Sequence, residues 1–295
     1  RGQGQKRLIL VRIRGSMIET IKTIANLRRR LDEWRAGGET IALVPTMGAL
    51  HEGHLSLVRV AKSKAGRTCA TLFVNPAQFG EGEDFAEYPR DTDDDAEKLE
   101  NEGCDLLFRP DAEEIYPPGH ATKVTVEGLG DILEGEFRPG FFTGVATVVT
   151  KLLVQALPDF AVFGEKDYQQ LLVIRRLTRD LDIPVVIEAA PTVRDDDGLA
   201  LASRNANLTS DERRIAPALF GTLSQVAENV GRGVDTEEQA AWGLDQLERA
   251  GFDKIDYFTV RDAETLAPAA GASRPARVLA AAWLGKARLI DNVAV

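Results

Sequence analysis

Two histidines three positions apart are the residues of this chain whose types and spacing best suit chemistry. His51 and His54 lie in the stretch VPTMGALHEGHLSLV, residues 44–58. Side chains at positions i and i+3 share one face of a helix, so we expect the two imidazoles side by side. Pro45 and Gly48 precede them and predict that a strand ends at the proline and that a tight turn leads into a helix.

The chemistry expected of such a pair is the binding of a phosphate. Open parallel sheets bind ligands at the carboxyl ends of their strands, where the next helix offers free N–H groups to anions. Gly53 lies between the histidines, so we expect a ligand to approach the backbone there. The plain alternative is a helix with two surface histidines and an incidental glycine. The spacing excludes the zinc-protease motif, and the lack of G-x-G-x-x-G after the strand argues against a dinucleotide-binding dehydrogenase.

A second candidate group lies in the stretch FGEKDYQQL, residues 163–171. A strand is expected to end at Gly164, so Lys166, Asp167 and Gln170 fall together at the start of the next helix. A lysine charge suits phosphate, and an aspartate accepts hydrogen bonds from ribose hydroxyls. The alternative is that Asp167 caps the helix while Lys166 is a solvated surface residue.

Polar side chains in two further loops complete a candidate site. In RDDDGLALASRN (194–205), Ser203 and Arg204 would close over a triphosphate. In FVNPAQF, Asn75 and Gln78 follow a strand and carry uncharged groups suited to hydroxyls and a carboxylate. For both loops the alternative is an ordinary polar connection.

An acidic run in YPRDTDDD, residues 88–95, is a candidate magnesium site. Mg²⁺ favours one or two carboxylates together with phosphate oxygens, and this run would supply a carboxylate. The alternative is the start of a helix, where acidic residues complement the helix dipole.

The elements expected around these residues alternate between strand and helix, which predicts an α/β protein with a doubly wound parallel sheet. The expected strands cover 40–44, 68–75, 104–110, 159–164 and 184–193. The expected helices begin at Met17 and at residues 50, 91, 143 and 166.

The composition and the expected secondary structure of the chain change near residue 193. Alanine-rich helices (210–250) and then short strands follow, which predict a smaller C-terminal α+β domain. We therefore divide the chain into an upstream extension or artificial remnant (1–16), a larger domain (17–192) and a smaller lid domain (193–295). The resemblance described below implies that the larger domain binds a nucleotide and pantoate.

The composition is that of a soluble globular protein, with 44% hydrophobic and 28% charged residues among 295. A formal net charge of −10 argues against a general nucleic-acid or membrane surface. No apolar run approaches the length that spans a bilayer. Cys69 and Cys104 suggest neither a disulfide framework nor a zinc site, so we expect a reducing, cytoplasmic setting.

The H-x-G-H element resembles the phosphate-binding signature of the nucleotidylyltransferase superfamily. In order, VPTMGALHEGH, FVNPAQF, YPRD, FRPG..TGV, FGEKDYQQL, DGLALASRN and RLIDN resemble the pantothenate synthetase family from about Met17 to Val295. This resemblance implies a Rossmann-like domain with a smaller closing domain, a homodimer, and ligation of pantoate and β-alanine with ATP and Mg²⁺ through a pantoyl-adenylate, releasing AMP and pyrophosphate.

The resemblance also implies roles for individual residues. The catalytic residues would be His51, His54 and Lys166. The ATP site would comprise Met47, His51, Gly53, His54, Gly164, Lys166, Asp167, Val193, Ser203 and Arg204. The pantoate site would comprise Pro45, Met47, Asn75, Gln78, Arg138 and Gln170, and the metal would be held by Asp94 or Asp95.

Two positions depart from the family pattern. Ala202 stands where the family usually has a serine, and Phe141 stands where it usually has a histidine. The first would weaken triphosphate contacts, and the second removes a side chain whose role is then in doubt. Two alternatives remain, namely another nucleotidylyltransferase that makes a stable nucleotide product, and a catalytically silent nucleotide-binding homologue.

Overall fold

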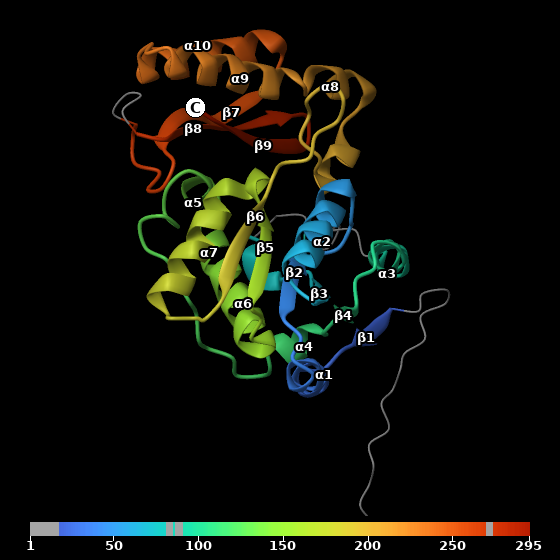
Figure 1. Cartoon of the computed structure of the whole chain (residues 1–295). Helices are drawn as coiled ribbons and strands as arrows, with labels where there is room; N and C mark the ends of the chain where they lie inside the picture. Colours follow the sequence, from blue (N-terminus) through green and yellow to red (C-terminus); the bar gives the residue numbers. More distant parts are fainter. Residues whose placement is uncertain (1–17, 81–84, 86–90, 270–273) are drawn as a thin grey trace, which may run out of the picture.

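Six parallel strands form the larger sheet of the molecule, in the order β1-β4-β3-β2-β5-β6 (Figure 1). The computed structural model describes residues 18–80, 85, 91–269 and 274–295. The strands are β1 (Glu19–Ile21), β2 (Ile41–Thr46), β3 (Arg67–Leu72), β4 (Leu106–Phe108), β5 (Phe160–Gly164) and β6 (Val186–Ala190). The predicted α/β class with a doubly wound parallel sheet is confirmed.

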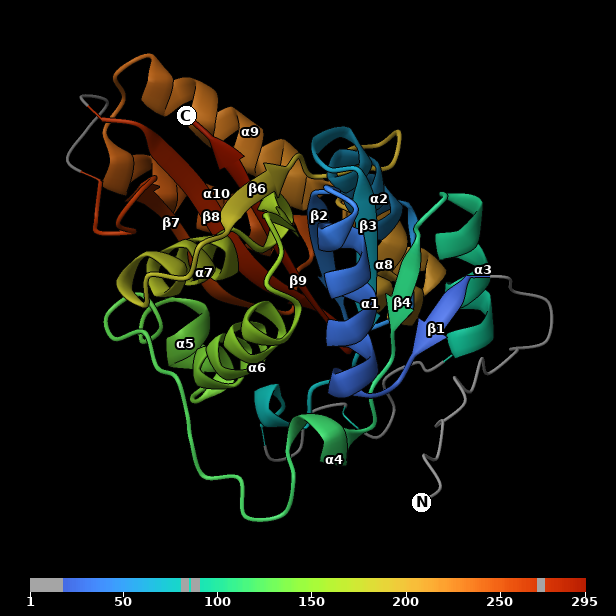
Figure 2. The same cartoon turned by 60° about the horizontal axis from the view of Figure 1, so that its bottom comes forward.

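Helices cover both faces of this sheet, because alternate residues of a strand point in opposite directions. These helices are α1 (Ile24–Ala36), α2 (Glu52–Lys64), α3 (Thr92–Asn101), α6 (Phe141–Ala156) and α7 (Tyr168–Asp180). Figure 2 shows α1, α6 and α7 on one side of the sheet and α2 and α3 on the other. In β2, Ile41 and Leu43 belong to the cluster of the first group, whereas Ala42 and Val44 belong to the cluster of the second. Burial on both faces explains why this strand is a continuous apolar run.

Pro45 lies inside β2, so the prediction that it ends the strand is wrong. β2 continues to Thr46, whose carbonyl accepts a hydrogen bond from Phe73 N on the β3 side at 3.1 Å. Alternate residues of a strand bond to opposite neighbours, so Pro45 faces β5. The paired register of β2 with β5 ends at Leu43, and the ladder therefore needs no N–H from the proline.

The first apolar residues form a strand, which corrects the prediction that a helix begins at Met17. Residues Glu19–Ile21 pair with β4 at the edge of the sheet, and α1 begins only at Ile24. Thr23 caps α1, because its Oγ1 accepts a hydrogen bond from Asn26 N at 3.3 Å. A three-residue strand is too short for its pattern to be told from a helical turn.

Short helical turns connect the main elements and carry several candidate site residues. They are η1 (Pro76–Gln78), α4 (Ala112–Ile115), α5 (Glu134–Phe137), η2 (Glu165–Asp167) and η3 (Ser203–Asn207). η1 and η2 directly follow β3 and β5 in the chain. They therefore lie at the carboxyl edge of the parallel sheet.

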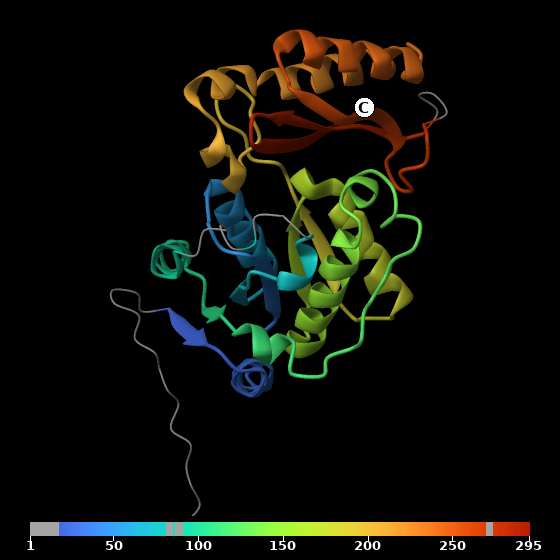
Figure 3. The same cartoon turned by 180° about the vertical axis from the view of Figure 1, so that it is seen from behind.

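A second sheet of three antiparallel strands lies beyond that carboxyl edge (Figures 1 and 3). Its elements are α8 (Ser210–Ile215), α9 (Ala218–Gly231), α10 (Thr236–Ala250), β7 (Lys254–Asp262), β8 (Ala276–Leu284) and β9 (Ala287–Ala294). α9 and α10 pack on one face of this sheet around Leu223, Leu247 and Val278, which are fully buried. Leu279 of β8 instead belongs to the buried cluster of the parallel sheet, so the two parts are in contact.

The chain passes from one sheet to the other between Ala190 and Ser203, and the predicted boundary near residue 193 falls in this connection. The predicted extension 1–16 lies outside the described residues. Among the helices that the structure describes, none is both long enough and apolar enough to cross a bilayer.

Candidate active site

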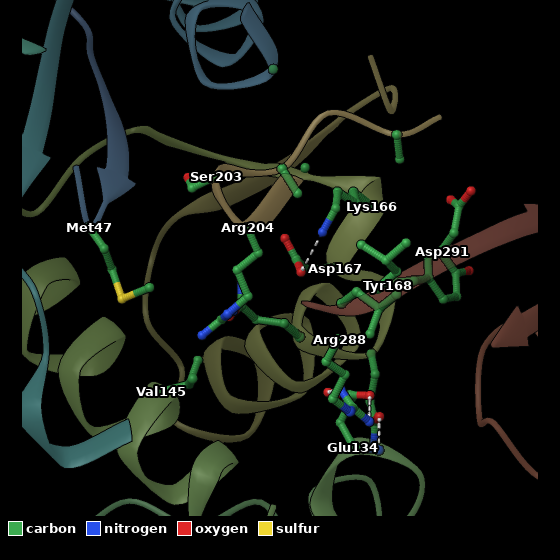
Figure 4. A pocket seen from close by; sticks show the side chains of 18 of the residues that line it. Met47, Glu134, Val145, Lys166, Asp167, Tyr168, Ser203, Arg204, Arg288 and Asp291 are labelled. Carbon is green, nitrogen blue, oxygen red and sulfur yellow. Dashed lines mark hydrogen bonds and ion pairs between the residues drawn. The ribbon is translucent and has the colours of Figure 1, made fainter. Parts of the chain in front are cut away.

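A cavity of about 880 Å³ lies between the carboxyl edge of the parallel sheet and the three-stranded sheet (Figure 4). The structure brings every predicted ATP- and pantoate-site residue to its wall. These are Pro45, Met47, His51, Gly53, His54, Asn75, Gln78, Arg138, Gly164, Lys166, Asp167, Gln170, Val193, Ser203 and Arg204. The two predicted metal ligands, Asp94 and Asp95, do not line it.

The two histidines form a capping box at the start of α2. His51 is the N-cap residue, and its Nδ1 accepts a hydrogen bond from Gly53 N at 3.2 Å. His51 N in turn donates to Nδ1 of His54 at 3.3 Å, and the two ring centroids are 4.1 Å apart. A neutral imidazole has one donor and one acceptor nitrogen. Since both Nδ1 atoms accept, each ring carries its proton on Nε2, on the side away from the helix backbone.

Burial keeps both rings neutral. It lowers the pKa of His51 to about 4, and the positive charge of Lys166 contributes to this shift. Burial likewise lowers the pKa of His54 to about 3, with further contributions from His51 and Lys166. At neutral pH the pair therefore offers two N–H donors to a phosphate without adding positive charge to the site.

Gly53 makes room for the ring of His51, and the expectation that a ligand approaches the backbone there stays a prediction. A Cβ atom on Gly53 would lie 2.9 Å from Cε1 and 3.0 Å from Nδ1 of His51. The space above the glycine is thus filled by the His51 ring, which folds over the helix terminus. A side chain here would displace that ring.

The turn before α2 is held by Asp95, a role that the sequence did not suggest. Ala49 has a φ of 52°, a left-handed conformation that is unfavourable for alanine. The carboxylate of Asp95 accepts hydrogen bonds from Ala49 N at 2.9 Å and from Leu50 N at 2.7 Å. Asp95 is 1% exposed, so this carboxylate is committed to the backbone of the turn.

The predicted magnesium ligands therefore do not fit a metal site at the cavity. Asp95 is occupied by the turn, and Asp94 forms an exposed ion pair with Lys98 at 2.6 Å. Across the ranges that the structure describes, no three His, Cys, Asp or Glu side chains are grouped as metal ligands. The helix-start interpretation of the acidic run is the one that these contacts favour.

Lys166 and Asp167 lie in η2, immediately after β5. Their charged groups are 3.7 Å apart, and both line the cavity (Figure 4). Asp167 precedes α7, but its side chain makes no capping hydrogen bond, so the capping alternative is wrong. The carboxylate is half exposed and is placed to accept hydrogen bonds from a ligand hydroxyl.

Ser203 and Arg204 reach the cavity from the connection between the two sheets (Figure 4). Ser203 Oγ donates a hydrogen bond to Ala49 O at 3.1 Å. This contact joins the Ser203 loop to the turn that precedes the histidines. Arg204 extends into the cavity from the same loop.

The side-chain amide of Asn75 positions other residues at the cavity wall, and its assignment to the pantoate site stays a prediction. Its Nδ2 donates to Gln78 Oε1 at 3.0 Å and to Gly144 O at 3.1 Å. Its Oδ1 accepts hydrogen bonds from Ala77 N and from the hydroxyl of Tyr116. With these four bonds, Asn75 uses its whole hydrogen-bonding capacity.

Gln78 is oriented by two neighbours at the cavity wall. Asn75 donates to its Oε1, and its own Nε2 donates to the sulfur of Met47. A Cβ atom on Gly144 of α6 would lie 2.1 Å from Ala77 O, so only glycine lets α6 approach η1 this closely.

Phe141 acts as a platform for Arg138. The guanidinium carbon of Arg138 lies 3.8 Å from the centroid of the Phe141 ring, which is a cation–π geometry. Arg138 Nη2 also lies 3.5 Å from Gln78 O. The phenylalanine that replaces the family's usual histidine therefore holds the guanidinium of Arg138 at the cavity wall.

Sequence reasoning missed a buried ion pair that joins the two parts of the molecule. Arg288 of β9 donates to both carboxylate oxygens of Glu134, at 2.7 and 2.8 Å, and the hydroxyl of Tyr257 donates to Glu134 at 2.9 Å (Figure 4). Asp256 accepts a further bond from Arg288 at 2.7 Å. Glu134 begins the four-residue turn α5, in a stretch whose sequence has no regular pattern or motif, so no local signal marked it.

The model of the pantoate-beta-alanine ligase family matches residues 19–294. A protein named pantothenate synthetase from Paramagnetospirillum magneticum is 55% identical over 278 residues, which cover 94% of this chain and 98% of that protein. The pantothenate synthetase of Caulobacter vibrioides is 53% identical over 278 residues, covering 93% and 98% of the two chains.

Solved structures agree with these sequence matches. A pantothenate synthetase from Thermus thermophilus superposes with a TM-score of 0.88 at 46% identity, covering 93% of this chain and 98% of that chain. A pantoate-beta-alanine ligase from Francisella tularensis, complexed with beta-gamma ATP and beta-alanine, superposes with a TM-score of 0.79 at 35% identity, covering 95% and 98%.

Proposed function

The chain belongs to the pantoate-beta-alanine ligase family, and from that membership we propose how its cavity joins pantoate to β-alanine at the expense of ATP. The reaction passes through a pantoyl-adenylate and releases pyrophosphate and AMP. The observation that carries the proposal is the pair of neutral imidazoles 4.1 Å apart at the mouth of the parallel sheet. Two outward N–H donors at a helix N-terminus are suited to a triphosphate.

In the first step the carboxylate of pantoate attacks the α-phosphorus of ATP, and pyrophosphate leaves. The carboxylate is already a nucleophile, so the step needs alignment and charge stabilisation instead of a strong base. We assign the stabilising donors to the Nε2–H groups of His51 and His54 and to the ammonium group of Lys166. Ser203 and Arg204 would bind the departing phosphates, and Asp167 the ribose.

The pantoate site would lie beside Gln78, Gln170 and Arg138. Gln78 is held in place by Asn75 and Met47, so its amide is oriented before pantoate binds. The guanidinium of Arg138 on the Phe141 ring supplies a positive charge for the carboxylate. These groups would bring the pantoate carboxylate to the α-phosphorus.

We derive no step through Mg²⁺, because Asp94 and Asp95 do not fit a magnesium site at this cavity. Their carboxylates are bound by Lys98 and by the turn at Ala49 and Leu50.

In the second step the amine of β-alanine attacks the acyl carbon of the adenylate, and AMP leaves. Water would hydrolyse the adenylate, so the intermediate needs a closed cavity. We propose that residues 193–295 act as a lid over the domain of residues 17–192. The Glu134–Arg288 ion pair and the Ser203–Ala49 hydrogen bond support this, since both join the two parts across the cavity.

A coupled assay of AMP release with pantoate, β-alanine and ATP tests this function directly. AMP should appear only when all three substrates are present, together with an amide product. A stable nucleotide-containing product would instead indicate another nucleotidylyltransferase. Absence of turnover with all three substrates would indicate a silent nucleotide-binding homologue.

The order of the two steps can be tested separately by positional isotope exchange in ATP. Exchange should require pantoate but not β-alanine, because the adenylate forms before the amine reacts. A requirement for both acids would exclude the stepwise scheme.

We infer that the chain forms a homodimer through the amino edge of its parallel sheet. Four large apolar side chains are about half exposed there, at the ends of α6 and α7 and the start of β6, namely Val154, Leu157, Leu181 and Val186. Light scattering should give twice the chain mass of 32.2 kDa, and Leu181→Lys with Val186→Lys should halve it. A monomeric unsubstituted protein would exclude the dimer.

We infer a reducing, cytoplasmic setting from the two cysteines. Cys69 and Cys104 are buried as thiols in clusters on opposite faces of the parallel sheet. Burial raises the pKa of the Cys104 thiol to about 12, which keeps it protonated and unreactive. Fractionation of the native source cell tests the location.

A further inference from the structure

The closing motif RLIDN, residues 288–292, lies on β9, and its last two residues have no role in the mechanism above. Its last residue, Asn292, is 5% exposed and lines the cavity. The Nδ2 group donates to Glu165 O at 3.0 Å and to Lys166 O at 2.9 Å. Asn292 therefore binds the main chain of η2, the turn that carries Lys166.

The orientation of the Asn292 amide is fully determined. Both atoms facing its Nδ2 are carbonyl oxygens, which only accept hydrogen bonds, and its Oδ1 accepts from the guanidinium of Arg277, which only donates. A carboxylate in place of the amide would face two carbonyl oxygens without a proton between them. The site thus distinguishes asparagine from the isosteric aspartate.

Asp291 makes a matching contact on the other side of the strand. It accepts two hydrogen bonds from Arg194, at 2.6 and 2.9 Å, and it is 4% exposed. Arg194 lies in the loop that leads to Ser203. It also donates to Gly198 O in that loop and stacks on Phe220 of α9. Adjacent residues of a strand point to opposite faces, so β9 contacts both triphosphate-binding segments at once.

We propose that Asn292 is a positioning residue, which sets the direction of the Lys166 ammonium group by holding the main chain of η2. Asn292 belongs to the three-stranded sheet, whereas Lys166 lies in η2 directly after β5 of the parallel sheet, and the two are 126 positions apart in the chain. Lys166 is therefore correctly directed only while the two parts are in contact. This inference rests on the proposed function, because it assumes that Lys166 acts on ATP.

The test compares Asn292→Ala, Asn292→Asp and Lys166→Ala, alone and in combination, by single-turnover formation of the adenylate. Each Asn292 substitution should slow this step about 10- to 100-fold, since a misplacement of about 1 Å has effects of this size. The aspartate variant should be at least as slow as the alanine variant. The KM for β-alanine should not change.

The combined variant decides whether Asn292 acts through Lys166. In the Lys166→Ala background, Asn292→Ala should cause no further loss, because the group that it positions is absent. Multiplication of the two losses would overturn the proposal, as would unchanged adenylate formation in both Asn292 variants. If Asn292→Ala does not fold, the isosteric Asn292→Asp gives the same comparison.

Two controls separate a positioning role from a general loss of structure. Asn229 donates its Nδ2 to Gln239 Oε1 within the C-terminal part, at 2.7 Å, so Asn229→Ala removes a similar bond away from the cavity and should leave adenylation unchanged. A fall in the thermal midpoint that accounts for the lost rate of the Asn292 variants would overturn the proposal. Failure of the unsubstituted protein to release AMP would instead overturn the proposed function.

Discussion

The parallel sheet and the three-stranded sheet supply different kinds of residue to the cavity between them. The parallel sheet supplies His51, His54 and Lys166 from turns that directly follow its strands. The three-stranded sheet supplies Arg288 and Asn292, whose polar atoms bind groups of the other part. The first set lines the cavity with groups free for a ligand in the proposed reaction, whereas the polar atoms of the second set bond to protein.

The parallel sheet thus carries the groups proposed to react with ATP, and the three-stranded sheet carries groups that hold parts of the site in position. The histidines are held by hydrogen bonds within one helical turn, so they are oriented whether or not the cavity is closed. Lys166 and Ser203 also have contacts with the opposite part, so in the proposed mechanism their arrangement depends on closure. An enzyme that builds a water-sensitive adenylate benefits if full activity requires a closed cavity.

The largest effect is expected from the parallel-sheet side. His54→Ala should lower the rate of adenylate formation about 100- to 1000-fold, because an N–H donor to the transition state is removed. Rapid-quench measurement of the adenylate checks this. His120→Ala changes an exposed histidine in a loop and serves as the control. Near-normal turnover of His54→Ala would remove the histidine from the mechanism.

A smaller effect is expected where the two parts meet. Glu134→Gln should lower the free energy of unfolding by about 2–3 kcal/mol, because Arg288 loses its buried charged partner. Denaturant titration measures this change. Glu228→Gln removes an exposed ion pair with Arg232 and should change stability by less than about 0.5 kcal/mol. Equal effects of the two substitutions would show that the ion pair does not join the parts.

Asp95 tests whether the turn before the histidines or a metal ion needs the carboxylate. Asp95→Asn should lower stability by about 1–2 kcal/mol and slow adenylation, because Ala49 N and Leu50 N bond different carboxylate oxygens and the amide retains only one of these two acceptors. The Mg²⁺ concentration giving half-maximal rate should not move. Asp94→Asn, at an exposed position, should leave both quantities unchanged. A shift of the Mg²⁺ requirement in either variant would restore the magnesium assignment.

The smallest effect is the dependence of stability on pH. The folded protein holds the pKa of His54 at about 3, below its ordinary value of 6.5, so the unfolded chain takes up protons first. Stability should therefore be complete above pH 6.5 and fall as the pH drops below it, by about 1 kcal/mol from this residue at pH 5.5. Denaturant titrations at pH 7.5 and 5.5 measure the change, and His54→Gln should reduce it. An equal decline in that variant would mean that His54 is protonated in the folded state.

Several site features could be predicted because they depend on residues close together in the chain. The i, i+3 spacing of His51 and His54 places both rings on one helical turn, and the alternation of strands and helices places that turn at the carboxyl edge of a parallel sheet. Lys166 and Asp167 follow by the same reasoning, since they come directly after β5.

The corrections arose where a local pattern has two meanings. Pro45 is compatible with a strand interior when its missing N–H faces no ladder partner, and only the neighbouring strands reveal this. Asp95 has a carboxylate of the kind that binds metal ions, but this carboxylate accepts hydrogen bonds from the backbone of a left-handed turn. The four hydrogen bonds of the Asn75 side chain include partners 41 and 69 positions away in the chain, and the residues next to Asn75 give no sign of these partners.

The sequence by itself determined the class of fold, the family and the residues of the parallel sheet that line the cavity, because periodicity and short motifs encode contacts between near neighbours. Only the tertiary structure decided that Asn292 holds the turn of Lys166, that Glu134 meets Arg288 and that Gly53 shelters a ring. These contacts depend on where separate elements pack, and a single sequence carries no local signal for a hydrogen bond between residues 126 positions apart.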